Sequence, residues 1–120
     1  MTISTGPRRA PAAPFDRFHI DDMVGGWFVG AFTPAALHLD VAEVAFKRLI
    51  AGQTEARHVH LRATEVVLII SGSIDVSGTA MTSGDIWVVP PGQPSQATAL
   101  TDCALVVVKT PSAPEDKYPA

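Results

Sequence analysis

The amino-acid sequence predicts a single all-β domain. Short runs rich in Val, Ile, Phe and Trp alternate with Gly, Pro, Ser and Thr along the middle of the chain, a pattern typical of strands joined by turns. No stretch of about 10 residues shows a helical period of apolar positions, which argues against alternating strands and helices. With 120 residues, the chain is long enough for one packed core and too short for two.

Seven apolar runs are expected to form strands. In chain order they are residues 26–32, 43–50, 56–61, 65–71, 73–77, 85–90 and 104–109. Between the first two runs, residues 33–40 indicate a helical turn, because Thr33 can serve as an N-cap and Pro34 suits the first helical position.

The folded domain is expected to comprise residues 15–110. Residues 1–14 are rich in Pro, Ala, Ser and Thr and lack a hydrophobic period, so they predict a flexible N-terminal arm. Residues 111–120 contain three prolines and predict an irregular C-terminal tail.

Two of the expected strands, residues 65–71 and 104–109, are apolar on both faces instead of alternating. Each must therefore bury one face in an interior and the other against a second layer. In so small a chain, closing a barrel uses one face and leaves the other exposed, so a partner subunit is expected to cover it. The sequence thus predicts a homodimer.

Composition argues against several classes of partner. The formal net charge is −3, and no Lys/Arg run is longer than the pairs at 8–9 and 47–48, so nucleic-acid binding is not expected. The longest apolar run, residues 66–70, is far shorter than the roughly 20 residues that span a membrane. Prolines and acids follow Arg8-Arg9 where an export signal would be apolar, which predicts a cytoplasmic protein. The single cysteine, Cys103, is expected to be a small buried apolar residue.

Two histidines lie one residue apart, ahead of a glutamate that opens an apolar run. Residues two apart on a strand share a face, so His58 and His60 project together. After a short turn, Glu65 can bring its carboxylate to the same point. Two imidazole nitrogens and one carboxylate oxygen suit a divalent transition metal (Fe, Mn, Ni, Zn or Cu) better than Ca or Mg. On these residues alone, a solvated face or a hydrogen-bonded histidine pair competes with a metal site.

The spacing around these residues resembles the first motif of the cupin superfamily. That motif is reproduced by Gly52, five residues, His58-x-His60, four residues, Glu65, six residues and Gly72, and the second motif by Gly84, five residues and Pro90-x-Gly92. The resemblance covers residues 52–99 and implies a small single-domain bacterial cupin. It further implies a jelly-roll β-barrel, commonly dimeric, in which the motif histidines and glutamate face the interior.

The chain departs from the second motif at its usual fourth ligand. Where cupins place a histidine three residues after the glycine, this sequence has Ser95, followed by Gln96. A regular strand would turn Ser95 inward, whereas a one-residue bulge would turn Gln96 inward and let it supply an amide oxygen. Gln96 is therefore the candidate fourth ligand and Ser95 the competing position. His19 and His38 lie outside both motifs and are expected at the surface.

Three functions stay open at this point. The leading hypothesis is a metal-dependent enzyme of oxygenase, isomerase or lyase type, with Glu65 and His60 as catalytic residues acting on a small polar substrate, because a two-His, one-Glu set leaves coordination positions open. The alternatives are a metal-free isomerase or epimerase of sugar type, in which Glu65 or a histidine is the acid or base, and a non-catalytic module that binds a small ligand.

For other polar and aromatic residues, a structural role is expected before a role in substrate binding. Glu43, Lys47 and Asp75 are expected as exposed charges on the outer strand face, with substrate binding at the barrel mouth as the alternative. Core or dimer-interface positions are expected for the aromatic residues, with substrate stacking second; these are Trp27, Phe28, Phe32, Phe46 and Trp87.

Overall fold

The computed structural model describes residues 14–120, and its regular elements are almost all strands. The described strands are β1 (Trp27–Val29), β2 (Glu43–Leu49), β3 (Thr54–Val59), β4 (Thr64–Ser71), β5 (Ser73–Val76), β6 (Thr79–Thr82), β7 (Ile86–Val89), β8 (Ser95–Ala99), β9 (Cys103–Thr110) and β10 (Tyr118–Pro119). One 3-10 turn, η1 (Ile20–Asp22), precedes them. Within the described part of the chain, no helix is long and apolar enough to cross a membrane. The predicted flexible arm, residues 1–14, lies outside the described residues except for Pro14.

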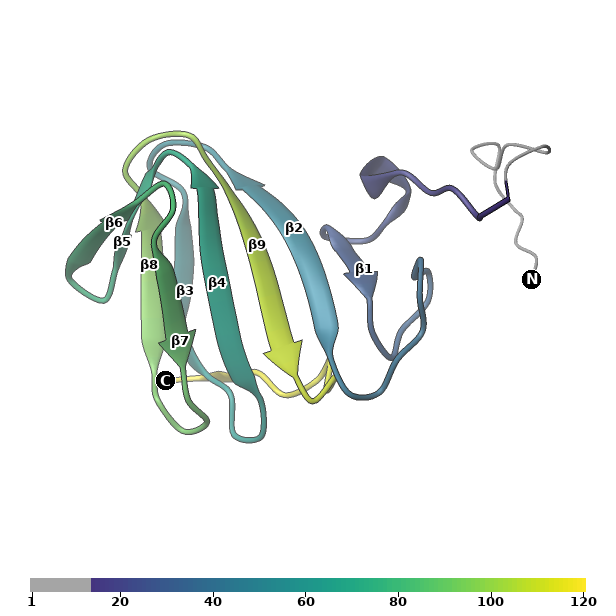
Figure 1. The fold of residues 1–120 in the computed structure, drawn as a ribbon. Coiled ribbons are helices and arrows are strands. Elements are labelled where there is room, and N and C mark those ends of the chain that lie inside the picture. Colours follow the sequence, from purple (N-terminus) through teal and green to yellow (C-terminus); the bar gives the residue numbers. More distant parts are fainter. Residues whose placement is uncertain (1–13) are drawn as a thin grey trace.

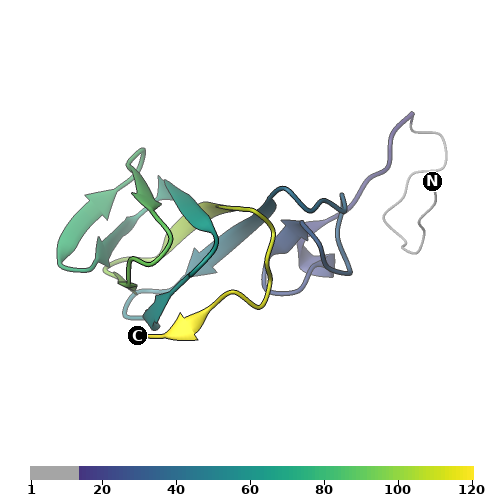
Figure 2. The ribbon, with the colours of Figure 1, turned by 90° about the horizontal axis from the view of Figure 1, so that it is seen from below.

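The strands form two antiparallel five-stranded sheets that face each other (Figures 1 and 2). The first sheet has the order β1-β2-β9-β4-β7, and the second has the order β10-β3-β8-β5-β6. The chain crosses repeatedly from one sheet to the other, so strands far apart in sequence, such as β2 and β9, become neighbours. This arrangement is the jelly-roll barrel that the resemblance of the two motifs implies.

The core lies between the sheets because strand residues alternate in direction. Along β9, burial alternates strictly from Cys103 to Lys109, as a period of two requires. The buried apolar cluster is Ala45, Leu49, Val67, Ile69, Ile74, Val76, Ala99, Cys103, Leu105 and Val107. Cys103 is a free buried thiol, as expected, and burial raises its pKa above the ordinary value.

Before β2, the chain lies beside the barrel, where β1 adds to the edge of the first sheet (Figure 1). The helical turn predicted for residues 33–40 is wrong. The Ala36 N–H donates to the Phe28 carbonyl, and Leu37 forms a parallel bridge with Val29. The segment therefore lies beside β1 and runs in the same direction at the bridge. These contacts use backbone groups that a helical turn would need for its own hydrogen bonds.

The C-terminal segment is more ordered than the predicted irregular tail. Residues 111–117 contain no strand or helix, but Ala113 and Asp116 within them are buried. Tyr118 and Pro119 then pair with β3 opposite Val59 and His58. The prediction of an irregular tail is thus wrong for the last residues, which extend the second sheet.

Strands β4, β7 and β9 are apolar on their outer face as well. That face consists of Val66, Leu68, Ile70, Ile86, Val88, Ala104, Val106 and Val108. Ile86 and Val88 remain 62% and 59% exposed in the isolated chain. Residues 14–120 therefore cover only the inner face of these strands.

Two glycines of the first motif differ in how crowded they are, which allows a matched test. Both have positive φ, Gly52 at 87° and Gly72 at 84°. A Cβ on Gly72 would lie 2.1 Å from the Asp102 carbonyl oxygen, whereas one on Gly52 would meet nothing within 4 Å. We expect Gly72→Ala to lower the free energy of unfolding by about 1–3 kcal/mol more than Gly52→Ala in urea titrations. Equal losses would contradict this packing.

Candidate metal centre

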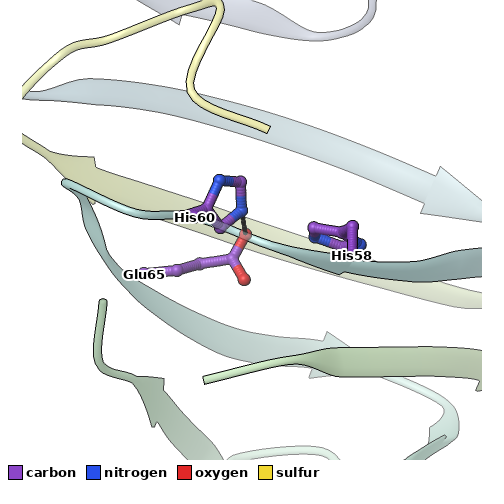
Figure 3. Close-up of side chains that lie close together, drawn as sticks. All are labelled: His58, His60 and Glu65. Carbon is purple, nitrogen blue, oxygen red and sulfur yellow. Dashed lines mark ion pairs between the residues drawn. The ribbon is translucent and has the colours of Figure 1, made fainter. Parts of the chain in front are cut away.

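Three side chains from the two facing sheets meet inside the barrel. His58 lies on β3, His60 just after its last residue, and Glu65 near the start of β4. One potential ligand atom from each lies within 4.8 Å of the others, and His60 and Glu65 point toward each other (Figure 3). The two imidazole rings stand edge to face with centroids 5.0 Å apart. The structure thus brings together the three residues that the sequence pattern singles out, His58, His60 and Glu65, which we call the triad.

Each imidazole is held by a backbone carbonyl on its Nδ1 side. His58 Nδ1 lies 2.8 Å from the Ala56 carbonyl oxygen, and His60 Nδ1 contacts the Asp116 carbonyl oxygen. A carbonyl only accepts hydrogen bonds, so both Nδ1 atoms carry the proton and donate it. In the neutral rings, both Nε2 atoms then keep a free lone pair. Metal-binding histidines are typically oriented by such a hydrogen bond on the opposite nitrogen.

The Nε2 atom of His60 lacks a hydrogen-bond partner, and within residues 14–120 it is the one such buried side-chain nitrogen or oxygen. Buried polar atoms are almost always paired, because an unpaired one costs about 1–3 kcal/mol. Glu65 Oε2 lies 3.9 Å away, which is too far for a hydrogen bond.

A divalent metal ion fits this arrangement. Two atoms bound to one ion at about 2.1 Å lie at most about 4.2 Å apart, so small side-chain rotations would bring all three ligand atoms onto one ion. The ion would satisfy the unpaired nitrogen of His60 and offset the charge of Glu65, and the mixed nitrogen and oxygen donors suit a transition metal.

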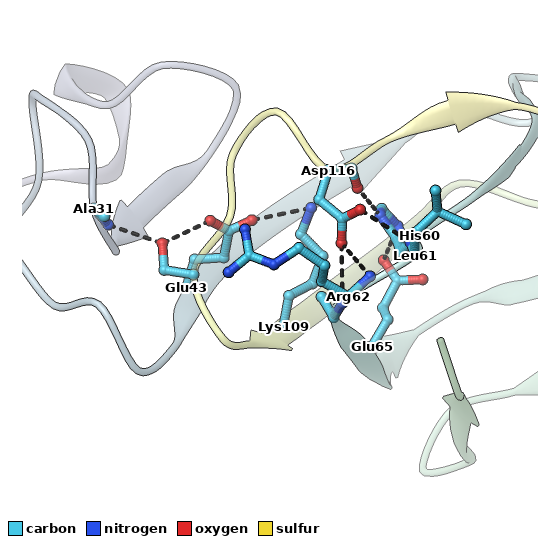
Figure 4. A network of polar contacts seen from close by, with 10 residues as sticks. Ala31, Glu43, His60, Leu61, Arg62, Glu65, Lys109 and Asp116 are labelled. Carbon is cyan, nitrogen blue, oxygen red and sulfur yellow. Dashed lines mark hydrogen bonds and ion pairs between the residues drawn. The ribbon is translucent and has the colours of Figure 1, made fainter. Parts of the chain in front are cut away.

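Asp116 organises the turn between β3 and β4. Its carboxylate accepts three backbone N–H groups at 2.9 Å each (Figure 4), from Leu61, Arg62 and Ala63. Burial acts to raise the pKa of this carboxyl, but the three N–H groups outweigh burial and hold the pKa below its ordinary value. The same residue's carbonyl accepts the His60 Nδ1–H. One residue therefore fixes both the turn and the imidazole.

At the position of the expected fourth ligand, Ser95 faces the interior and Gln96 does not. β3 and β8 pair Glu55 with Ala97, and the next aligned pair is His58 with Ser95. β3 therefore uses three residues where β8 uses two, so the bulge belongs to β3 and the alternation of β8 is undisturbed. Ser95 lines a small pocket that His58 and Glu65 also line, whereas Gln96 is exposed. The prediction that Gln96 supplies an amide oxygen is wrong, because it requires the bulge on the other strand.

The bulge in β3 also turns Glu55 toward the cavity. Glu55 and His58 are three residues apart, so regular alternation would place them on opposite faces, yet both line the same cavity. The Glu55 side chain forms no hydrogen bond or ion pair with another described residue. Sequence analysis missed Glu55 because the bulge leaves no local signal in the residue pattern.

A row of charged residues crosses the inner face of the first sheet beside the triad. In register, Glu43 pairs with Lys109, and Lys109 pairs with Glu65. Glu43 and Lys109 form a buried ion pair of 2.9 Å, and the Ser112 hydroxyl donates to Glu43 (Figure 4). The expected outer position of Glu43 is therefore wrong. Lys109 could have been found from the sequence, since the alternating burial of its strand places it inward.

Of the remaining predictions for polar residues and histidines, one is wrong and three are confirmed. Lys47 lines the cavity, so its expected outer position is wrong as well, because β2 turns the same face inward as at Glu43. Asp75 lies between two buried residues of β5 and projects outward, as expected. His19 and His38 are exposed, as expected; His19 Nδ1 accepts the Asp21 N–H at 3.1 Å.

A cavity of about 320 Å³ opens over the triad and is large enough for a small molecule. Trp27 and Phe32 form part of its wall, edge to face with ring centroids 6.4 Å apart. A smaller pocket of about 40 Å³ lies between the core strands and shares His58 and Glu65 with the cavity. Trp27 also packs against the apolar core, so it serves both the core and the wall.

No protein-family model matches the chain, and no curated protein matches it. Solved structures do. An uncharacterised conserved protein with a double-stranded β-helix domain from Klebsiella pneumoniae aligns with a TM-score of 0.62 and 24% identity, over 87% of this chain and 90% of that one. KdgF from a Halomonas species aligns with a TM-score of 0.61 and 20% identity, over 65% and 76%. A cupin-2 domain protein from Shewanella frigidimarina aligns with a TM-score of 0.54 and 14% identity, over 60% and 72%.

These similarities establish the fold. The chain has the cupin jelly-roll architecture, with two antiparallel sheets in the same arrangement as its structural neighbours. The three-residue group His58, His60 and Glu65 is a possible metal site within that fold.

Replacing Asp116 is expected to destabilise the turn on which His60 depends. Asp116→Ala removes three hydrogen bonds to a charged acceptor, so the free energy of unfolding should fall by about 2–3 kcal/mol in urea titrations. Glu115→Ala is the matched control, since Glu115 is the exposed neighbour and its loss should change stability by less than about 0.5 kcal/mol. Similar losses in both variants would argue against this role of Asp116.

Proposed function

We propose that this protein is a metal-dependent enzyme that acts on a small polar substrate. Its ion is held by His58, His60 and Glu65. The observation that carries the proposal is the buried His60 Nε2, which has no hydrogen-bond partner although the opposite nitrogen of the ring is anchored. This donor set supports Fe, Mn, Ni, Zn or Cu.

A divalent ion in this position supplies Lewis-acid polarisation of a carbonyl, enediol or carboxylate, and Fe would add oxygen chemistry. The protein's own residues have distinct roles. His60 keeps its Nδ1 proton on the Asp116 carbonyl, so only its Nε2 faces the reaction. Ser95 stands where an imidazole would close the site, which leaves room for a chelating substrate. Glu55 offers a carboxylate in the same cavity that can take up or return a proton.

Glu55 also supports a second candidate function, a metal-free isomerase or epimerase of sugar type. Such an enzyme needs two acid or base groups around the substrate, and Glu55 and Glu65 line the same cavity. Turnover that persists after chelation of metal would favour this alternative. Ligand binding without product would instead favour a binding module.

The metal site is tested by elemental analysis of untagged protein after reconstitution with each candidate metal. We expect about one ion per chain in the wild type and at least about tenfold weaker retention in His58→Ala and Glu65→Ala, because each variant removes a ligand. His38→Ala should retain the metal, since His38 is an exposed histidine away from the triad. Retention in both ligand variants, or no metal in the wild type, would refute the proposed site.

We also propose that the protein forms a cytoplasmic homodimer through the outer face of β4, β7 and β9. This face is a continuous apolar surface without a charged side chain, and a second copy offers the same surface across a twofold axis. The isolated chain leaves Ile86 and Val88 mostly exposed there.

The dimer predicts a specific response to a charge on that face. Val88→Asp places a carboxylate in the proposed contact and should shift the protein to monomer in size-exclusion chromatography with light scattering. Thr79→Asp, at an exposed position of the other sheet, should remain dimeric. A monomeric wild type, or a Val88→Asp variant that dimerises as tightly as the wild type, would contradict the proposal.

A further inference from the structure

One partly buried ammonium group in the cavity wall has no carboxylate partner among the described residues. Lys47 lines the cavity together with His58 and Glu65, and its Nζ lies 5.2 Å from the centroid of the Trp27 ring. Within residues 14–120, no carboxylate oxygen lies within 4.0 Å of this Nζ. Lys47 is thus a partly buried cation whose only described interaction is with an aromatic face.

Lys109 provides an internal comparison. Its Nζ lies 5.0 Å from the same Trp27 centroid, but it also forms the 2.9 Å ion pair with Glu43. Trp27 therefore supports two ammonium groups, of which one has an anion and the other does not. A cation–π contact contributes only about 0.5–2 kcal/mol and does not replace an anion for a cation withdrawn from water. The missing partner of Lys47 points to a ligand that brings its own negative charge.

The charges around the cavity indicate how much negative charge the ligand carries. Lys117 also lines the cavity but is exposed, so water and salt screen its charge. Among the lining residues that are not exposed, Lys47 and a divalent ion contribute three positive charges, Glu55 and Glu65 contribute two negative ones, and the Glu43–Lys109 pair cancels. The balance is one positive charge, which a monoanion neutralises and a dianion such as phosphate exceeds. The two glutamates in the wall also repel a doubly charged group.

We propose that the substrate is a small hydroxycarboxylic acid, or a close analogue, whose carboxylate pairs with the Lys47 ammonium. A second oxygen of the same molecule reaches the metal held by His58, His60 and Glu65, and the Trp27 ring forms the wall beside the carboxylate. This inference rests on the proposed metal-dependent function and adds the chemical class of the ligand.

The test compares acids with their neutral amides on metal-loaded protein by isothermal titration calorimetry. The probes are lactate with lactamide and 3-hydroxypropionate with 3-hydroxypropionamide, two pairs that differ in the spacing between hydroxyl and carboxyl. We expect at least one acid to bind the wild type at least about tenfold more tightly than its amide, as a charge-assisted contact requires.

Variants test whether Lys47 causes the preference for the acid over its amide. Lys47→Gln should abolish most of the preference for the acid, and Lys47→Arg should retain much of it, because the positive charge remains. Glu55→Gln should strengthen binding of the acid and leave the amide unchanged, since it removes a negative charge from the wall. Arg48→Gln is the matched control: Arg48 is the next residue on β2 and is exposed, so the preference should change by less than about twofold.

The outcomes separate this inference from the proposed function. Metal content is measured on every sample first. A wild type that holds no metal overturns the proposed function and, with it, this inference. A metal-loaded wild type that binds neither acid, binds acids and amides alike, or keeps its preference in Lys47→Gln overturns only the carboxylate inference. If Lys47→Gln does not fold, Glu55→Gln decides, because an affinity for the acid that does not rise in this variant overturns the carboxylate inference.

Discussion

The geometry of the candidate metal centre depends on one buried carboxylate, that of Asp116. Its three hydrogen bonds hold the turn that follows β3, and its backbone carbonyl holds the imidazole of His60. Because β10 pairs with β3 just beyond it, the C-terminal segment is attached to the site at two points. Residues of the expected irregular tail therefore position His60.

The barrel interior is divided between apolar packing and paired charge. On the first sheet, the charged row of Glu43, Lys109 and Glu65 lies next to the purely apolar row of Ala45, Val107 and Val67. Charges can occupy such an interior only where partners are available, and Glu43 with Lys109 satisfies that condition. His60 Nε2 and the Lys47 ammonium do not. Both unsatisfied groups border the same cavity, and the proposed metal and the proposed anionic ligand would satisfy both.

Short-range patterns predict the all-β class and the grouping of His58, His60 and Glu65, whereas the jelly-roll arrangement is what the resemblance to cupins implies. The spacing of His58, His60 and Glu65 predicts that these side chains lie close together, and they do so in the structure. The fourth position was mispredicted, since the identity of the bulged strand depends on the pairing of β3 with β8 and not on either strand alone. Asp116 was missed for a similar reason: its partners lie more than 50 residues away, and nothing near it in the chain indicates them.

The most direct test of the central claim is anomalous diffraction from crystals of the reconstituted protein, recorded at the absorption edge of the bound metal. The account predicts one dominant peak between the Nε2 atoms of His58 and His60 and the carboxylate of Glu65, with both Nδ1 atoms still on backbone carbonyls. A dominant peak at an exposed histidine such as His19 or His38, or an empty triad in protein that carries metal, would contradict it.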